Sequence, residues 1–392
     1  MDQPASSFVR SSPDVIHLDV AIVGSGPAGS AAALALSGSG LRVGVLEKAS
    51  LPRHKTCGGG VLHRAVALLP IDIRAVVEWE CRTAELVHHG PDLRFVCTRP
   101  APIVSMVMRD RFDHFLIQGA VSNGVELHAN TTVEEVGLSD TGVRLKTNRG
   151  DFVARFVIAA DGVTSVVARK TGRQELRNIV PALECEVKLR NGADARLKQT
   201  ARFDFGFVPA GYAWVFPKRD HLSIGVLTTR RGAANLPEYY RKYRDSLGIS
   251  DVVYEERHGY MIPCRPRGDM FSLPRVLFVG DAAGLVDPVT SEGITAGILS
   301  GQLAAHAIIA GKSDTRHVQT LYRSNLEKKL LADLQVARKL AAVLYDWPRL
   351  RAKLFSRHGQ KLSEALTQIV MGETGYARLV RQPRGYLRLL TG

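Results

Sequence analysis

The sequence predicts an α/β protein of two domains whose overall organisation is α+β. A parallel-sheet domain carries an inserted antiparallel sheet, and a helical region follows at the C-terminus. Three observations predict this fold. Residues 19–47 read as buried strand, glycine-rich turn, helix and second strand. Segments between residues 180 and 265 alternate apolar and polar residues, as strands with one covered face do. Residues 316–370 repeat apolar side chains at helical spacing.

The opening unit, residues 19–47, is typical of a Rossmann-type domain that binds a dinucleotide. Gly24, Gly26 and Gly29 form G-x-G-x-x-G between its first strand and its helix. The first glycine permits a sharp turn, the second lets a pyrophosphate approach the backbone, and the third lets helix and strand pack closely. Glu47 follows about 20 residues later, where a carboxylate binds ribose hydroxyls. The alternative is a glycine-rich turn in another α/β protein.

The next segment, residues 51–61, reads L-P-R-H-K-T-C-G-G-G-V and is predicted to be an irregular loop. Its glycine run lets backbone approach a flat ligand, and Arg53 and Lys55 add positive charge. Cys57 directly precedes the glycines, so in a loop that faces a cofactor it can be a proton donor, a steric gate or a wall residue. An inert buried cysteine is the alternative.

Residues 104–120 predict a strand that runs into a helix, with Arg109 at the junction and Asp113 four residues later. An arginine at a strand end beside a dinucleotide site can pair with phosphate or ribose. The spacing fits a surface Arg–Asp pair equally well. Residues 125–160 predict antiparallel strands, and Asp161-Gly162 predicts a turn before a short helix in the nucleotide-binding layer.

The most distinctive strand of the inserted sheet is residues 211–218, G-Y-A-W-V-F-P-K. Tyr212, Trp214 and Phe216 are spaced by two and therefore project from one face. Such a face is either core or the lining of a pocket for a flat or long apolar ligand, and the pattern leaves both open.

A second glycine-bearing loop lies within residues 275–302. A buried strand ends in Gly280-Asp281, and in open α/β sheets ligands bind at the carboxyl ends of the strands. Pro288 breaks the chain, and Gly293-Ile294 open a helix whose backbone N–H groups can stabilise negative charge on a ligand.

The charge of the chain indicates which partners to expect. The 392 residues carry a formal net charge of +14, and residues 313–392 hold 15 Lys and Arg against 6 Asp and Glu. This basic region predicts either a solvated helical surface or contact with an anionic membrane or an acidic substrate. Because the sequence shows no RNA- or DNA-binding motif, we expect no nucleic acid partner.

The five cysteines are scattered and form no C-x-x-C, so the sequence predicts neither a zinc site nor a disulfide framework. A reducing location fits better, and we expect the cytoplasm, with peripheral association at the inner face of the membrane as an alternative. Residues 1–18 read as a flexible tail rather than as a signal peptide.

Three blocks in a fixed order resemble the flavoprotein group typified by para-hydroxybenzoate hydroxylase: G-S-G-P-A-G at 24–29, A-A-D-G-V-T-S-V-V-A-R at 159–169 and V-G-D-A-A-G-L-V-D-P at 279–288. The resemblance implies FAD as the cofactor, with Glu47 on the adenosine ribose and Arg109 and Asp281 on the ribose–pyrophosphate and ribityl region. It also implies that the loop at 288–294 runs beside the isoalloxazine. The residues expected to bind FAD are Gly24, Gly26, Pro27, Ala28, Gly29, Glu47, Lys48, Lys55, Cys57, Gly58, Gly59, Arg109, Val133, Asp161, Gly162, Gly280, Asp281, Pro288, Gly293 and Ile294.

Within that group, P-R-H-K-T-C-G-G-G at 52–60 and Y-A-W-V-F-P-K-R-D at 212–220 resemble the geranylgeranyl reductase family. The resemblance covers roughly residues 19–310 and implies reduction of isolated C=C bonds in prenyl chains, with hydride from reduced flavin N5. It makes Cys57 the catalytic candidate for the proton route. It implies that the substrate contacts Gly60, Tyr212, Trp214 and Phe216.

The alternative activity is that of an FAD-dependent monooxygenase or halogenase acting on a specialised metabolite. Flavin halogenases share a related W-x-W-x-I-P motif but carry G-E-S where this chain has C-G-G. The electron donor stays open between NADPH, NADH and ferredoxin, because the sequence has no second dinucleotide fingerprint. The expected partners are a small-molecule or lipid substrate, an anionic membrane surface and an electron-donor protein.

These assignments predict four regions. Residues 1–18 are the tail, and residues 19–175 with 266–312 form the FAD-binding domain. Residues 84–106 with 176–265 form the antiparallel-sheet substrate domain, and residues 313–392 form the basic helical region.

Overall fold

A computed structural model describes residues 15–90, 92–173, 179–192, 195–230, 235–266 and 271–381. Its first sheet is parallel at the centre and carries the opening unit. In spatial order the main strands are β17 (Ser272–Leu273), β18 (Val276–Phe278), β11 (Gly150–Ala159), β1 (Ile16–Val23), β2 (Val43–Leu46) and β8 (Glu126–His128). From β18 to β8 all neighbours are parallel. The central strands β18 and β2 and the last four residues of β1 and β11 are apolar and buried, because both faces of the sheet are covered there. An antiparallel ribbon of β9 (Val133–Leu138) and β10 (Val143–Thr147) joins β11.

Helices cover this sheet, and α1 (Pro27–Leu36) lies at its centre. It packs on α8 (Ile294–Gly311), where a Cβ at Gly301 would lie 2.2 Å from the carbonyl oxygen of Ala28. Helix α8 is long and apolar enough to cross a membrane by composition, yet 72% of it is buried inside the protein. Helix α8 is therefore a core helix of this domain. The other helices of this layer are α3 (Arg109–Val121), α4 (Val166–Lys170), α7 (Gly280–Ala283) and α9 (Thr315–Leu326).

The inserted sheet has seven described strands. In spatial order they are β16 (Val252–Pro263), β12 (Ile179–Leu189), β15 (Leu222–Thr228), β14 (Gly211–Pro217), β13 (Thr200–Phe205), β5 (Thr83–His88) and β6 (Leu93–Thr98). The prediction of a purely antiparallel sheet is wrong at one pair, since β13 and β5 run parallel. The reason is that β5 enters the sheet from the first domain through a long crossover, as a parallel pair requires. Helices α5 (Ala195–Gln199) and α6 (Leu236–Ser246) cover one face.

A three-stranded sheet joins the two domains, in the order β3 (Gly60–Leu62), β7 (Val104–Val107) and β4 (Val77–Cys81). Helix α2 (His63–Val66) and the 3₁₀ turn η1 (Arg74–Val76) follow β3 and precede β4. Two predicted boundaries therefore shift. The predicted loop over 51–61 ends in a strand, and residues 104–106 belong to this sheet rather than to the substrate domain.

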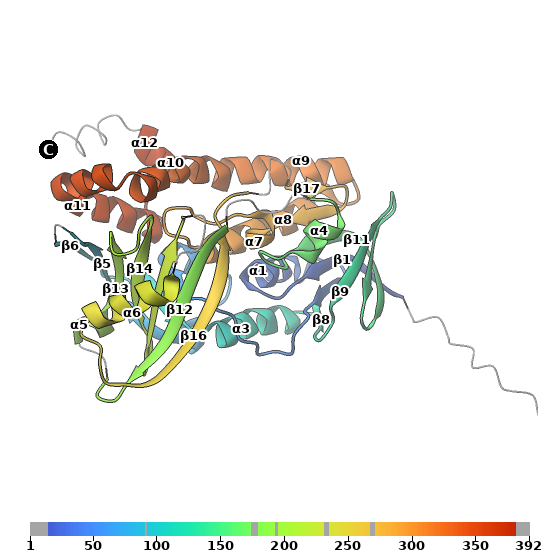
Figure 1. Cartoon of the computed structure of the whole chain (residues 1–392). Helices are drawn as coiled ribbons and strands as arrows, with labels where there is room; N and C mark the ends of the chain where they lie inside the picture. The colour runs from blue at the N-terminus through green and yellow to red at the C-terminus, as the bar shows by residue number, and fades with distance from the viewer. Residues whose placement is uncertain are drawn as a thin grey trace, which may run out of the picture.

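The C-terminal region is helical, as predicted. It comprises α9, a π-helical turn η2 (Glu327–Leu331), α10 (Ala332–Asp346), α11 (Pro348–Met371) and α12 (Tyr376–Arg381). The predicted break at Pro348 is confirmed, because α10 ends two residues before it. Figure 1 shows α9 and α10 running along one side of both domains, with α11 folded back beneath α10 over the seven-stranded sheet. The predicted tail is too long, since β1 begins at Ile16; residues 1–14 and 382–392 lie outside the described part.

Candidate active site

The G-x-G-x-x-G turn has the geometry that a bound pyrophosphate needs. Gly24 has φ +99°, and a Cβ on Gly29 would lie 1.9 Å from the Gly24 carbonyl oxygen, so both positions require glycine. Gly26 differs, because among the described atoms a Cβ there would approach only Arg53 Nη2, at 3.8 Å. The protein thus leaves open space at the start of α1, whose free N–H groups favour an anion.

Arg53 and Glu47 frame this space. Glu47 is 3% exposed and accepts hydrogen bonds from Ser25 N (3.0 Å), Ser25 Oγ (2.7 Å) and Ala49 N (3.1 Å). Burial opposes ionisation of Glu47, but Arg53 and these hydrogen bonds lower its pKa overall. Arg53 lies 3.4 Å from Glu47 and 3.2 Å from Asp113, and its buried Nη1 makes no directed hydrogen bond. An underused guanidinium beside Gly26 fits a phosphate oxygen.

Arg109 pairs with Asp113, but the pair is buried, so the alternative of a surface Arg–Asp pair is wrong. Arg109 is 9% exposed and Asp113 fully buried, with a bidentate contact at 2.8 and 2.9 Å. Burial disfavours the charged guanidinium, yet Asp113 and Cys57 raise the pKa of Arg109 overall. The Arg109 side chain also contacts that of Cys57. Arg109 therefore links the dinucleotide unit to the cysteine loop.

The three blocks separated in sequence meet at this turn. A Cβ on Gly24 would lie 2.6 Å from the carbonyl oxygen of Ala160, and one on Gly280 would lie 3.0 Å from Cβ of Ala28. Asp161 accepts a hydrogen bond from Val167 N at 3.0 Å, while its buried Oδ1 has no partner among the described atoms. Burial raises the pKa of Asp161. This unpaired carboxyl oxygen fits a ligand donor.

Asp281 and Lys55 form a second polar centre. Tyr260 OH donates to Asp281 Oδ2 at 3.1 Å, and Lys55 Nζ lies 3.4 Å above the Tyr260 ring centre. Burial, assisted by Arg109, lowers the pKa of Lys55 to about 8, so it is mostly charged at neutral pH. A Cβ on Gly293 would lie 3.0 Å from Asp281 Oδ1. The loop before α8 therefore approaches Asp281 closely.

The cysteine loop lies against the aromatic strand. A Cβ on Gly58 would lie 2.9 Å from Phe216 and 3.0 Å from Trp214 Nε1. Gly59 has φ +69°, and a Cβ there would lie 2.4 Å from Lys218 Nζ. Cys57 Sγ accepts a hydrogen bond from Gly59 N at 3.4 Å. The two motifs that suggested the family are thus in contact.

Lys218 holds this loop and was predicted only to end a strand. It is 3% exposed, and its Nζ donates to the carbonyl oxygens of Gly58 and Val107, both at 2.8 Å. A lysine after a strand usually reaches solvent, and the two acceptors are far away in sequence. No local signal could therefore have identified this role.

Replacing Lys218 with Met should lower the free energy of unfolding by about 1–3 kcal/mol, because two buried carbonyl groups lose their donor. Urea unfolding of the purified protein measures this. Lys188→Met is the matched control, since Lys188 is about half exposed and pairs with Asp220 on the surface. Equal stability of the two variants would contradict a bracing role for Lys218.

The aromatic strand belongs in large part to the core. Tyr212 and Trp214 are 5% and 6% exposed and pack with Leu344 and Phe355 from the C-terminal helices. Tyr212 OH donates to the carbonyl oxygen of Thr290 at 2.5 Å, which ties the strand to the loop before α8. Trp214 Nε1 is buried with no partner in the described part of the chain. Contact of these residues and of Gly60 with substrate stays a prediction.

Contact of Lys48 and Val133 with FAD stays a prediction. Lys48 is exposed, and Val133 is 5% exposed in the core of the parallel-sheet domain. The structure also brings in residues that the sequence did not single out. Asp287 accepts from Arg64 at 3.2 Å and from Tyr376 OH at 2.9 Å, joining the loop at 288–294 to α12. Because these partners are 223 and 89 positions from Asp287, spacing could not reveal them.

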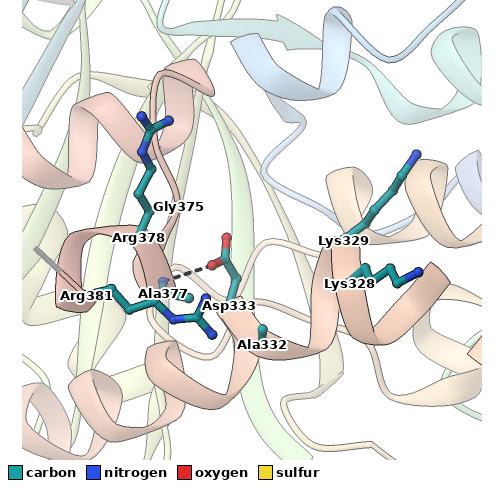
Figure 2. A pocket seen from close by; sticks show the side chains of 8 residues that line it. All are labelled: Lys328, Lys329, Ala332, Asp333, Gly375, Ala377, Arg378 and Arg381. Carbon is teal, nitrogen blue, oxygen red and sulfur yellow. Dashed lines mark hydrogen bonds between the residues drawn. The ribbon is translucent and has the colours of Figure 1, made fainter. Parts of the chain in front are cut away.

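A cleft of about 450 Å³ lies between η2, the start of α10 and α12. Figure 2 shows basic side chains from η2 and α12 on its two sides, with the Asp333 carboxylate between them accepting a hydrogen bond from Ala377 N. The lining residues are Lys328, Lys329, Ala332, Asp333, Gly375, Ala377, Arg378 and Arg381. Four of the 15 Lys and Arg residues of the predicted basic region line this cleft.

The glycine turn, its acidic partner and the two later blocks define an FAD-dependent oxidoreductase, and residues 17–201 match the family model for an FAD binding domain. The chain is 31% identical to digeranylgeranylglycerophospholipid reductase 1 of Methanopyrus kandleri, over 84% of this chain and 91% of that one. It is 28% identical to menaquinone reductase of Mycolicibacterium smegmatis, over 83% and 84%. A geranylgeranyl bacteriochlorophyll reductase-like protein of Thermoplasma acidophilum has the same fold, with a TM-score of 0.78 at 22% identity over 96% and 99% of the chains. The protein belongs to the geranylgeranyl reductase family. The predicted fold class and FAD binding are confirmed.

Proposed function

We propose that this protein reduces isolated C=C bonds in a prenyl chain carried by a polar lipid. The observation that supports this most directly is the contact of the Cys57–Gly60 loop with Trp214 and Phe216. That contact places a thiol and an apolar aromatic surface beside the residues that fit FAD. The named relatives act on two different lipids, a digeranylgeranyl glycerophospholipid and menaquinone, so the proposed substrate class is their shared prenyl chain.

The residues of the chain have distinct roles in this proposal. Reduced FAD, when bound, supplies a hydride. Lys55 and Arg109 hold positive charge beside Asp281 and Cys57, which favours binding of an anionic cofactor. Trp214 and Phe216 exclude water from the alkene. Cys57 holds a proton at Sγ, and because an isolated alkene accepts hydride poorly, proton transfer must precede or accompany hydride transfer.

The test is anaerobic incubation with a chemical reductant. Digeranylgeranylglycerophospholipid and menaquinone are offered in separate arms, and products are read by mass spectrometry. We expect a gain of two hydrogens per reduced bond without oxygen. The alternative monooxygenase or halogenase activity would require O₂ and would leave both lipids unchanged in its absence. NADPH, NADH and reduced ferredoxin in place of the chemical reductant then identify the donor.

We further propose that the basic cleft contacts an anionic membrane surface, where a prenyl lipid resides. Four Lys and Arg side chains line it against one Asp, and each basic residue near an anionic surface contributes about 1 kcal/mol. Helix α10 connects the cleft to Leu344, which packs with Tyr212 and Trp214. Docking at the cleft would hold the protein at the source of its substrate.

The double variant Arg378→Glu with Arg381→Glu should lower binding to vesicles containing anionic lipid by at least about tenfold, since two attractions become repulsions. Co-sedimentation with vesicles at low and physiological salt measures the change. Arg169→Glu with Lys170→Glu alters the same charge at the end of α4 and serves as the control. A similar loss of vesicle binding in both double variants would show that binding depends on net charge alone. It would contradict a membrane-binding surface localised at the cleft.

A further inference from the structure

A pair of glutamates on β12 lies on the same face of the sheet as the aromatic strand. Glu184 is paired with Gly225 of β15, and Gly225 is paired with Trp214 of β14, so all three share one face. The indole covers Gly225, since a Cβ there would lie 2.0 Å from the ring. Glu184 therefore lies directly beyond the indole that contacts Gly58. Glu186 is the next residue of β12 on this face.

The cysteine loop also reaches this pair from the other side. His258 of β16 is paired with Glu184, and its ring lies 4.3 Å from the ring of His54. His54 precedes Cys57 by three positions and Gly58 follows it. Residues on both sides of Cys57 in the sequence, His54 and Gly58, therefore contact residues that lie near Glu184 on this face. The carboxyl pair lies between the sheet and the loop.

The surroundings shift the pKa values of the two glutamates in opposite directions. Glu184 is 3% exposed and accepts a hydrogen bond from Ser223 Oγ at 2.8 Å. Burial and the neighbouring Glu186 raise the pKa of Glu184 to about 9. Burial opposes ionisation of Glu186 as well, but its contact with His221 and the charge of Lys218 lower its pKa overall. These surroundings favour a proton on Glu184 over one on Glu186.

A route leads from this proton to solvent. Glu186 Oε2 lies 2.8 Å from His221 Nε2, and His221 Nδ1 lies 2.8 Å from Asp220. Side-chain exposure rises along the route, from 14% at Glu186 to 17% at His221 and 58% at Asp220. The ring of His221 has two exchangeable nitrogens and so suits proton transfer.

Lys218 couples the pair electrostatically to the cysteine loop. The Lys218 ammonium group donates to the Gly58 carbonyl and interacts electrostatically with Cys57 and with both glutamates. The remaining charged groups facing the pair lie at its rim: Glu256, paired with Glu186 across β16, and Glu78, which acts on Lys218. Lys218 is thus the group that connects the pair to the loop.

We propose that Glu184 and Glu186 form a proton store that reloads Cys57 after each reduction. This reloading step rests on the proposed function. One alkene carbon takes hydride and the other takes the Cys57 proton, breaking the S–H bond and forming C–H. The thiolate regains a proton through Lys218 from Glu184, and Glu184 is reprotonated from solvent through His221 and Glu186. These residues act through Cys57 and do not touch the alkene.

Glu184→Gln tests the store, because an amide keeps the shape and accepts the Ser223 bond but holds no transferable proton. The infrared difference spectrum of wild type minus variant, recorded without substrate, should show the band of a protonated carboxyl above pH 7. Repeated turnover should slow by at least about tenfold while a single turnover from loaded Cys57 proceeds normally. Glu238→Gln, at an exposed helix position, is the control.

Stability supplies a second readout that needs no substrate. The folded protein binds the Glu184 proton more tightly than the unfolded chain, whose carboxyl ionises near 4.5, so stability should fall as pH rises from about 4.5 to about 9. Glu184→Gln should lose this slope.

A difference spectrum without the carboxyl band overturns the proton store. A band in the difference spectrum together with unchanged repeated turnover in Glu184→Gln overturns the reloading role. A wild type that reduces no C=C bond overturns the proposed function and the reloading step with it, while the infrared band still decides the store.

Discussion

Gly26→Val is expected to yield a folded protein that purifies with less than about a tenth of the wild-type flavin, a loss of at least 1.4 kcal/mol in binding. The reason for this expected loss of flavin lies in the immediate surroundings of Gly26. A Cβ at Gly26 approaches only the tip of Arg53, at 3.8 Å, within the described chain, so the fold itself tolerates a side chain. The added methyls would instead occupy the space facing the helix N-terminus, which is where we expect the pyrophosphate to bind.

Flavin absorbance after gel filtration and thermal unfolding measure binding and folding separately. Gly259→Val is the matched control, because a Cβ at that exposed strand position meets nothing within 4 Å. Gly29→Ala should behave differently and destabilise the fold, since its Cβ would lie 1.9 Å from the Gly24 carbonyl oxygen. Normal flavin content in Gly26→Val would show that the cofactor lies elsewhere.

Cys57→Ala is expected to keep FAD and to lose about 100-fold or more in turnover, the usual contribution of a positioned proton donor. The sulfur contacts Arg109 and the Gly59 N–H, and both of these partners lie within the candidate site itself. Flavin content and turnover of the same preparation are compared. Cys185→Ala is the control, because Cys185 is buried on the opposite face of the sheet, away from the loop. Undiminished turnover in Cys57→Ala would remove Cys57 from the mechanism.

Sequence reasoning was strongest where a feature is encoded within one short segment. The turn at Gly24–Gly29 and the break at Pro348 each follow from local patterns, and the structure has both. The prediction of strands with one covered face is wrong for β14, which is buried on both faces because helices pack on either side of the sheet. The parallel pairing of β13 with β5 did not follow, because it depends on a chain path through another domain.

The same limit applies to the site. Spacing alone suggested the Arg109–Asp113 pair but could not show that it is buried beside Cys57. Lys218 looked like the end of a strand because its acceptors, Gly58 and Val107, lie 160 and 111 positions away. Glu184 and Glu186 read as outward polar positions of an alternating strand. Only the register of three strands places them on the face below the cysteine loop.

The most direct test of the proposed activity is a single turnover without oxygen. The flavoprotein is reduced with one equivalent of dithionite and mixed anaerobically with a digeranylgeranyl glycerophospholipid. Flavin reoxidation is followed by absorbance and the lipid by mass. We expect one flavin to be reoxidised for each C=C bond that is reduced, with no oxygen atom in the product. Flavin that stays reduced until O₂ is admitted, followed by an oxygenated or halogenated product, would contradict it.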